Sequence, residues 1–520
     1  MKLRKFNTTG ICIPGQHYMV AGGEKILKIM NLVCDGCYFT INRARQYGKT
    51  TTLGLLEKAM HGEEYVCASI SFEGADCMFE NPRAFCRQFL LLIQDAIEFE
   101  DGEFASLWQD ADVVDFNMLS RHISKLCKDK KVVLMIDEVD AVSNNRVFLQ
   151  FLSMLRSGYL KRGGDKAYTF HSVILAGVYD VKNIKLKLVI EGLHSQQEGE
   201  RQYNSPWNIA TEFDVDMSFS PDEIASMLED YENDHKTGMD ISVVSEEIHR
   251  YTSGYPFIVS VICKYIDERL DKMWSVDGVQ SAVKILVEEK NTLFDSLSKN
   301  LESNRRLYEL VYDVLILGVP RTYSINNPTV DLGVRYGIIT GFNSLIAVSC
   351  KVLEIVICNY FISKDEEEGR QIVGVLQNDV VHGGRFDMEL CLRKFAEHYA
   401  EVFDKRDAEF LERHGRLLFL SFLKPLINGM GFYHIESHFT DLRRMDVVVD
   451  YGRDQFVIEL KLWKGTKAQS ESYEQLLGYM NSKKMDKGYL LTFDFRKEGN
   501  KERKSEWVRI EGKQIFEVIV

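Results

Sequence analysis

The chain has 520 residues, more than one hydrophobic core usually organises, so several domains are expected. Hydrophobic residues make up 45% and charged residues 27%, and only 8 prolines are present, which argues against long disordered linkers. The formal charge of −13 opposes non-specific adhesion to nucleic acid, so any such binding must come from local basic patches.

No segment has the features of an export signal or a membrane span. The basic N-terminus is followed by residues 6–10, which lack the apolar run of a secretory signal. The most apolar stretches, such as 311–319 and 417–423, are too short to cross a bilayer. The scattered cysteines are typical of reduced core residues, and the Cys34 and Cys37 pair favours a tight turn over a metal site. We expect a cytoplasmic protein with no membrane contact.

The first half alternates short apolar runs with helical patterns, which predicts an α/β fold with a parallel sheet covered by helices. The expected strands are residues 38–42, 65–72, 132–137, 172–176 and 213–217, and the main expected helices are 51–60, 83–99 and 118–128. Residues 1–219 are therefore expected to form one domain.

A phosphate-binding loop is predicted at residues 43–50, because they follow an apolar strand and open a helix. Backbone N–H groups at the helix start would hold the phosphates, Lys49 would reach the β and γ oxygens, and Thr50 would ligate Mg²⁺. Arg43 stands where the full pattern has glycine. The residues expected to bind the nucleotide are Arg43, Arg45, Gly48, Lys49, Thr50, Thr51 and Asp137.

A second signal is the buried strand at residues 131–138, which ends in Asp137 and Glu138. An acid at the end of a parallel strand near the phosphate loop is where a Mg²⁺ ligand belongs. Asp137 would hold the ion together with Thr50, and Glu138 would orient and polarise the attacking water. Alone, the acidic pair is equally compatible with a solvated strand end; with the loop, it predicts binding of ATP and Mg²⁺.

Residues 1–290 resemble the bacterial AAA-ATPase-like family, within the STAND-type P-loop ATPases. The matching segments are residues 6–10 with 17–20, 42–50, 137–138, 176–180, 205–209 and 254–256. The resemblance implies that Arg43 is compatible with ATP binding, since that family tends to carry arginines in place of the first loop glycine. It also implies that residues 254–256 start a lid helix near the nucleotide, and that Asp180 or Asn183 senses the γ-phosphate.

Beyond the predicted core, residues 220–295 read as a helical lid that opens with the helix-start signal of Ser220 and Glu223. Residues 296–365 contain helical runs and a small hairpin, which suggests a winged helix. The charged run 364–368 marks a boundary. Residues 366–520 then form a last domain, with helices to about 430 and strands after it.

The last domain contains two alternating runs on either side of Gly452 and Arg453, which fits a two-residue hairpin. Tyr451 would then face Asp454, and counting back sets Asp446 opposite Glu459, with Lys461 on the same face. Opposed acids destabilise a sheet unless cations lie between them, and Lys461 and a divalent metal would supply these. Such a group suits metal-assisted phosphodiester hydrolysis, whereas a surface ion-pair network is the structural alternative.

These residues resemble the PD-(D/E)xK nuclease superfamily over about 380–500, with Asp446 as the first acid and Glu459 to Lys461 as E-x-K. The resemblance implies that Asp446 and Glu459 hold the metal and that Lys461 and Gln475 complete the catalytic group. It further offers Glu412 as the helix glutamate that often completes such a site.

The sequence thus predicts an α/β protein with a P-loop sheet, a helical lid, a winged-helix middle domain and an α/β restriction-endonuclease-like domain. We expect an ATPase that controls a Mg²⁺-dependent nuclease acting on nucleic acid, with DNA the favoured substrate. One alternative is a STAND-like ATP switch whose nuclease fold is inactive and binds nucleic acid or a protein. Another is an ATPase that acts on protein clients, and the oligomeric state stays open.

Overall fold

The structure is a computed structural model of the 520-residue chain. It describes residues 4–61, 64–110, 112–142, 145–164, 167–178, 206–316, 319–367, 380–383, 385–403, 408–427, 431–437, 445–452, 454–463, 466–494 and 504–520. The chain divides into two compact units, Met1–Ala282 with Arg335–Gly337 and Val283–Val334 with Ile338–Val520. Each unit is described separately.

The N-terminal unit contains a parallel sheet of four strands, which correspond to four of the five strands that the sequence predicted. Its strands are β1 (Tyr38–Asn42), β2 (Tyr65–Ser71), β3 (Lys131–Asp137) and β4 (Ser172–Gly177), in the order β1-β4-β3-β2. All four are rich in apolar residues because the sheet is covered on both faces. Since β4 lies between β1 and β3, the predicted phosphate loop and the acidic pair follow strands that are not neighbours.

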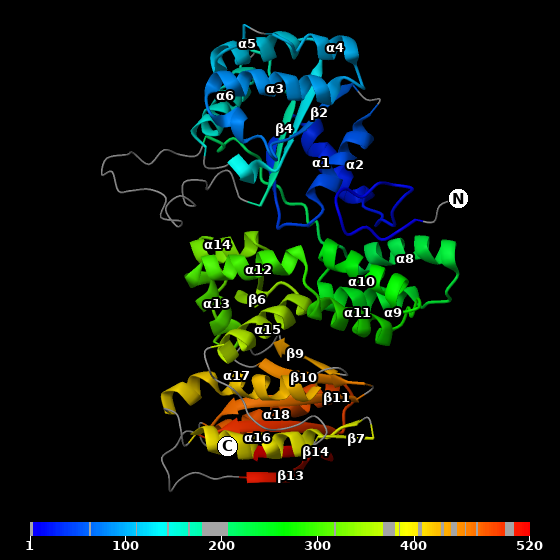
Figure 1. Cartoon of the computed structure of the whole chain (residues 1–520), viewed down its shortest axis with the longest axis vertical. Coiled ribbons are helices and arrows are strands. Elements are labelled where there is room, and N and C mark those ends of the chain that lie inside the picture. The colour runs from blue at the N-terminus through cyan, green and yellow to red at the C-terminus, as the bar shows by residue number, and fades with distance from the viewer. Residues whose placement is uncertain are drawn as a thin grey trace. The chain divides into compact units, whose positions relative to one another are not determined.

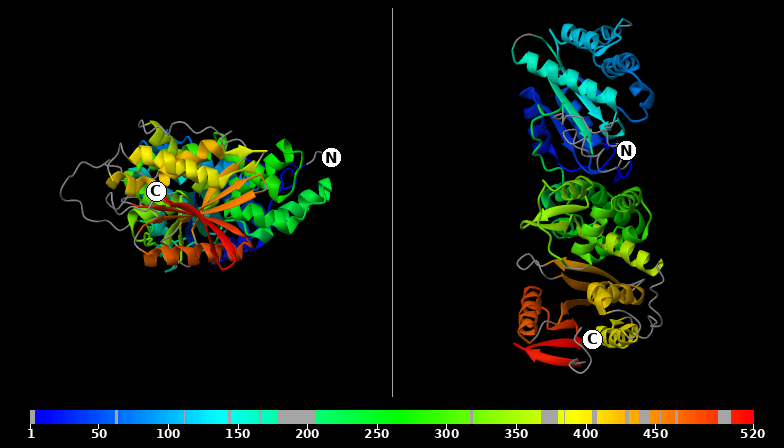
Figure 2. Two further views of the ribbon diagram at one scale, coloured as in Figure 1. Left: turned by 90° about the horizontal axis from the view of Figure 1, so that it is seen from below. Right: turned by 90° about the vertical axis from the view of Figure 1, so that its left-hand side faces the viewer.

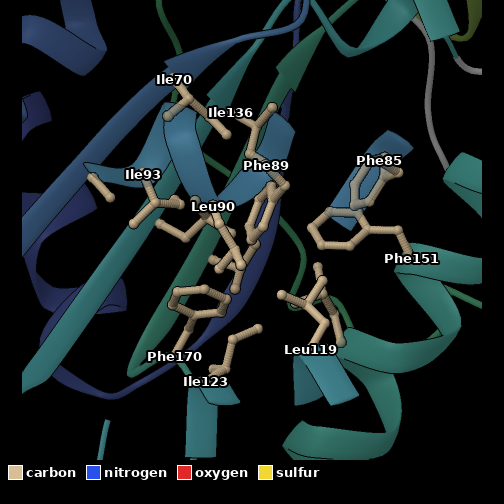
Figure 3. Close-up of a cluster of buried hydrophobic side chains, with 14 of the residues drawn as sticks. Ile70, Phe85, Phe89, Leu90, Ile93, Leu119, Ile123, Ile136, Phe151 and Phe170 are labelled. Carbon is tan, nitrogen blue, oxygen red and sulfur yellow. The ribbon is translucent and has the colours of Figure 1, made fainter. Parts of the chain in front are cut away.

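Helices cover both faces of this sheet (Figure 1). On one face lie α1 (Gly23–Cys34) and α2 (Lys49–Met60), and on the other α3 (Pro82–Ile97), α5 (Phe116–Leu126) and α6 (Arg146–Arg162). Figure 3 shows the hydrophobic core on the face covered by α3, α5 and α6, where Phe85 and Phe89 of α3 lie beside Phe151 of α6. The short helix α4 (Gly102–Ser106) adds to this layer.

The predicted fifth strand at residues 213–217 is wrong, because this segment makes no strand pairing in the structure. Only Thr211, just before it, forms an isolated parallel bridge with Phe39 of β1. Val215 is nonetheless buried in the core beside α1 and α2. Its carbonyl oxygen accepts a hydrogen bond of 2.7 Å from the Arg43 side chain. A side-chain contact therefore holds the segment beside the sheet without a backbone ladder.

Four helices follow: α8 (Pro221–His235), α9 (Ile241–Thr252), α10 (Pro256–Arg269) and α11 (Val276–Glu288). The predicted helix start is confirmed, since Ser220 and Glu223 form a reciprocal capping box. The N-terminal segment packs on α8, where Phe6 stacks on Tyr231 with 5.3 Å between ring centroids. This bundle is the region for which the sequence predicted a lid.

The second unit begins with three helices, a hairpin and a long helix. These are α12 (Thr292–Ser303), α13 (Arg305–Leu315), α14 (Pro328–Arg335), β5 (Ile339–Phe342), β6 (Leu345–Val348) and α15 (Lys351–Glu367). The predicted hairpin is confirmed by the antiparallel pairing of β5 with β6. The charged run 364–368 was expected to mark a domain boundary. Up to Glu367 it instead continues α15, since lysine and glutamate are good helix formers.

The C-terminal part is an α/β sheet of six strands in the order β13-β14-β12-β11-β10-β9. The strands are β9 (Gly431–Ser437), β10 (Met445–Tyr451), β11 (Asp454–Leu462), β12 (Lys487–Phe493), β13 (Lys504–Ile510) and β14 (Lys513–Ile519). One face is covered by α18 (Thr466–Ser482), and the other by α16 (Met388–Phe403) and α17 (Ala408–Ile427) (Figure 2). A short hairpin, β7 (Val381–His382) with β8 (Arg385–Phe386), precedes α16.

All eleven cysteines are free thiols, as expected from their scatter along the chain. Cys34 ends α1 and Cys37 precedes β1, with Gly36 in a left-handed conformation between them, so this pair does lie in a tight turn. Among the residues that the structure describes, no helix is long and apolar enough to cross a membrane.

Candidate functional sites at two sheet edges

The predicted phosphate loop connects β1 to the start of α2. Gly48 precedes α2 in the left-handed conformation, with φ of 78°, and an added Cβ there would meet no atom within 4 Å. Among the described residues, no side chain caps the start of α2, which leaves its first N–H groups available to an acceptor. The open glycine and the uncapped helix start fit a bound phosphate group.

Lys49 is buried at the first position of α2, where 7% of its surface is exposed. Its ammonium group donates hydrogen bonds of 3.0 Å to the carbonyl oxygens of Arg43 and Ala44. Burial lowers the pKa of Lys49, and the nearby charges of Asp140, Glu138 and Asp137 oppose this shift. Neutral carbonyls are weaker partners for an ammonium than phosphate oxygens, so they can be exchanged for a nucleotide.

Thr50 and Asp137 meet across the sheet edge. The Thr50 hydroxyl donates a hydrogen bond of 2.6 Å to Oδ2 of Asp137, which is buried at the end of β3. Thr50 lies in α2, which follows β1, and Asp137 ends β3. The contact therefore connects the ends of two strands between which β4 lies. A hydroxyl and a carboxylate are oxygen ligands of the kind that Mg²⁺ prefers, so the pair fits that ion.

Glu138 follows β3 in an unusual backbone conformation. Its φ is 55°, and its N–H donates to Oδ1 of Asp137 at 2.9 Å. The side chain is exposed at the sheet edge, yet partial burial and the charge of Asp137 raise the pKa of Glu138. Left-handed backbone in a residue other than glycine costs free energy and is frequent at functional sites. A carboxyl with a raised pKa is a better proton acceptor than an ordinary glutamate.

Three further loop residues were predicted to bind the nucleotide. The Arg43 guanidinium donates to the carbonyls of Asn42 at 2.8 Å and Val215 at 2.7 Å. Arg45 is exposed, and its carbonyl oxygen accepts a 2.6 Å hydrogen bond from the Tyr255 hydroxyl. The Thr51 hydroxyl accepts the N–H of Cys12 at 3.1 Å. These contacts anchor the loop, and a role in nucleotide binding stays a prediction for all three.

The turn at residues 254–256 directs Tyr255 to the loop. Gly254 has φ of 73°, and a Cβ there would lie 2.0 Å from the carbonyl oxygen of Phe219, so glycine is required. Pro256 starts α10 and Tyr255 is its N-cap. The Tyr255 ring also contacts Tyr47 edge-on, with centroids 4.6 Å apart. Sequence reasoning proposed the turn but missed this hydrogen bond between tyrosine and loop.

The second site begins with the hairpin of β10 and β11. The observed register pairs Tyr451 with Asp454 and Val447 with Ile458, as the sequence predicted. The paired stretch ends at Val447 and Ile458, and continuing its register by one residue along each strand would set position 446 opposite position 459. The side chain of Asp446 lies outside the described residues, and so does that of Glu412 in α17.

Glu459 is almost completely buried, with 1% of its surface exposed. It forms an ion pair with Lys461, two residues along the same strand. The Lys461 ammonium also donates a 3.1 Å hydrogen bond to Oε1 of Gln475, which α18 contributes. Oε1 of Glu459 is in ion-pair contact, but it accepts no hydrogen bond of regular geometry within the described part of the chain. A buried carboxylate oxygen in that state fits a metal ligand.

Packing of α18 fixes this arrangement. Leu476 of α18 packs against Val448 of β10 and Leu490 of β12, on the same face of the sheet as Glu459. Thr492, opposite Lys461 in β12, is also buried. The described side chains include no group of three or more potential metal ligands from His, Cys, Asp and Glu, a search that does not reach Asp446.

Comparisons with known proteins agree with both geometries. A family model described as an AAA-like domain matches residues 22–314, which is more than half of the chain. The chain belongs to the AAA-like domain family. A second model, the PD-(D/E)XK nuclease superfamily, matches residues 430–505 and so covers Glu459, Lys461 and Gln475. The resemblances inferred from the sequence are therefore confirmed for both domains.

Solved structures were also found that are similar to part of this chain, while a search of curated proteins returned no match. A Walker-type ATPase of Pyrococcus abyssi is 12% identical with a TM-score of 0.46, covering 68% of this chain and 99% of that one. The ORC2 protein of Aeropyrum pernix is 13% identical with a TM-score of 0.37, covering 69% and 98%. A variant of Thermotoga maritima RuvB is 13% identical with a TM-score of 0.31, covering 68% and 94%.

Two predictions about the AAA-like domain have different outcomes. Lys49, Thr50, Asp137 and Glu138 do lie together at one sheet edge. The γ-phosphate sensors suggested by resemblance, Asp180 and Asn183, lie outside the described residues. Sequence reasoning did not select Asp140, which reaches the same edge from the turn after β3.

Proposed function

We propose that the AAA-like domain binds and hydrolyses ATP and thereby controls metal-dependent cleavage of nucleic acid, DNA in preference to RNA, by the C-terminal domain. The observation that carries the nuclease half is the buried Glu459, paired with Lys461, whose ammonium is held by Gln475. A solvated surface network would not bury a carboxylate this deeply, because burial of an ionised group is costly without a purpose-built partner.

In the AAA-like domain, ATP would bind with its phosphates at the start of α2. Lys49 would exchange its two carbonyl partners for phosphate oxygens, and Thr50 with Asp137 would hold Mg²⁺. Bound Mg²⁺ neutralises charge that develops on the phosphates. Glu138, with its raised pKa, would orient a water molecule and accept its proton.

In the nuclease domain, Asp446 and Glu459 would hold the divalent metal. Such a metal lowers the pKa of a bound water and so supplies a nucleophile at neutral pH. Lys461 would stabilise negative charge on the phosphate in the transition state, and Gln475 would keep its ammonium in place. Control by ATP would act through the residue range 220–295 as a lid. The order of α12, α13, α14 and the β5–β6 hairpin supports a winged-helix contact with nucleic acid by residues 296–365.

One experiment with three proteins tests both halves. Wild type, Lys49→Ala and Glu459→Ala are incubated with plasmid, linear DNA and RNA in Mg²⁺ or Mn²⁺, with and without ATP, and both nucleotide turnover and cleavage are measured. We expect Lys49→Ala to lose ATP binding and Glu459→Ala to lose cleavage while it still hydrolyses ATP. Unchanged ATP affinity in Lys49→Ala would refute the ATPase, and unchanged cleavage in Glu459→Ala would refute the nuclease. Binding of nucleic acid by wild type without cleavage would favour the inactive-fold alternative.

A further inference from the structure

Asp140 lies in the short helix η2 (Val139–Val142), directly after the acidic pair that ends β3. Its Oδ2 accepts a hydrogen bond of 2.6 Å from the N–H of Val178, the first residue beyond β4. Its Oδ1 lies 2.8 Å from where a Cβ on Gly177 would be. A side chain at position 177 would therefore have to displace the Asp140 carboxylate or the Val139 side chain, which glycine avoids.

One partner of Asp140 is the peptide group between Gly177 and Val178. The N–H of Val178 and the carbonyl of Gly177 belong to the same peptide, and that carbonyl accepts the N–H of Arg43 at 3.1 Å. One rigid, planar group thus connects the first residue of the phosphate loop to the turn that carries Asp137 and Glu138. β1 and β3 both pair with β4, and this peptide continues the β1–β4 ladder by one residue and joins it to the turn after β3.

The charge of Asp140 also reaches the phosphate loop. Burial lowers the pKa of Lys49, and Asp140 is the strongest of the three acids that oppose the shift. A charged acceptor makes a stronger hydrogen bond than a neutral one, and bonds in series polarise one another. Asp140 is therefore suited to hold the peptide firmly in place.

We propose that Asp140 is a positioning residue for ATP hydrolysis, which sets the placement of Glu138 and Asp137 relative to the phosphate loop through the peptide between Gly177 and Val178. This inference rests on the ATPase half of the proposed function. Asp140 itself touches neither the phosphates nor water in this role. Its effect falls on turnover, since misplacing a reacting group by about 1 Å costs on the order of 100-fold in rate.

The test compares Asp140→Ala, Asp140→Asn and the matched control Glu73→Gln in the full chain. Glu73 is an exposed acid whose charge acts on the same Glu138, but it contacts Ser71 through its backbone N–H, which donates to the Ser71 hydroxyl at 3.1 Å. We expect Asp140→Ala to lower kcat by about 10- to 100-fold, because its loss releases the peptide. Asp140→Asn keeps an oxygen for the Val178 N–H, so its kcat stays within about fivefold of wild type. Glu73→Gln stays at the wild-type rate.

The dissociation constant for ATP is measured on the same proteins and stays at the wild-type value throughout, which separates positioning from a general loss of fold. Amide exchange at Val178 rises in Asp140→Ala alone. Wild-type kcat in Asp140→Ala, or a loss of ATP affinity as large as its loss of kcat, overturns the inference while wild type remains an ATPase. A wild-type protein that hydrolyses no ATP overturns the proposed function itself, and the inference with it.

Discussion

The two candidate sites each contain a lysine, buried Lys49 and partly buried Lys461, and the partners of the two lysines differ. Lys49 in the AAA-like domain donates to two neutral carbonyl oxygens of its own loop. Lys461 in the nuclease domain is paired with the carboxylate of Glu459 and bonded to Gln475. The Lys49 ammonium is bonded to neutral acceptors and can therefore bind an anion, whereas the Lys461 ammonium is already paired with the Glu459 carboxylate.

This difference follows from where each lysine lies. Lys49 starts a helix whose free N–H groups favour negative charge, and the acids at the edge of the sheet act on it without a direct hydrogen bond in the described contacts. Lys461 shares one face of β11 with Glu459, so the strand period itself creates the pair. A helix start thus provides an exchangeable site, and a strand provides a fixed one. Removing the two lysines is then expected to have different consequences for stability.

The largest expected effect is on the fixed pair. Lys461→Met leaves the buried Glu459 carboxylate without its cation and should destabilise the C-terminal sheet by about 3 kcal/mol. The double variant Lys461→Met with Glu459→Gln removes the unpaired charge and should recover most of that loss. Urea titration monitored by amide exchange in β11 and β12 measures both. Wild-type stability of Lys461→Met would contradict this prediction, and it would mean that water solvates the Glu459 carboxylate in solution.

Lys49→Met should instead change stability by less than about 1 kcal/mol, because it removes a charge that burial already disfavours. The lowered pKa means that the unfolded chain holds this proton more tightly than the native state does. Wild-type stability should therefore rise with pH between the lowered pKa and about 10.4, the value of an unperturbed lysine. Thermal unfolding of both proteins across this range isolates the lysine, and an identical pH dependence in the two would contradict the interpretation.

Much of this arrangement follows from local sequence patterns. The strands of the first sheet are apolar runs, and the register of β10 with β11 follows from the position of the turn at Gly452. Because the strand period is two, that register also determines which positions share a face with Glu459. The loop at Gly48 and the acids after β3 are likewise recognisable from spacing alone.

The features that sequence could not predict depend on the order of the strands. Asp140 and Val178 are far apart in the chain and meet because β4 lies next to β3. The segment 213–217 has the composition of a strand but pairs with none. The distant Arg43 side chain instead donates a hydrogen bond to a backbone carbonyl of this segment. Tyr255 reaches the loop through a turn that Gly254 alone permits. None of these contacts leaves a periodic signal.

The pH dependence of ATP hydrolysis, which we expect to depend on Glu138, is a further way to distinguish the two sites. Burial and the charge of Asp137 raise its pKa, and a proton acceptor must be deprotonated to act. ATP hydrolysis should therefore decline as the pH falls through this raised pKa, above the value of about 4.3 for an ordinary glutamate. Glu138→Gln should abolish this acid limb along with most turnover, and cleavage in the metal-dependent assay should keep its own pH profile. An acid limb that persists in the glutamine variant would assign it to another group.

The smallest expected effect concerns the hydrogen bond that the lid turn makes to the exchangeable site. Tyr255→Phe removes the hydroxyl that donates to the Arg45 carbonyl but keeps the ring against Tyr47, so stability should fall by only about 1 kcal/mol. Since that bond braces the loop whose carbonyls hold Lys49, ATP affinity should fall by about threefold to tenfold. Tyr265→Phe is a comparison variant in α10, where the ring of Tyr265 lies under the Arg269 guanidinium at 4.2 Å. Equal ATP affinity in wild type and Tyr255→Phe would contradict this prediction. It would mean that the phosphate loop keeps its conformation, and Lys49 its position, without the hydrogen bond from Tyr255.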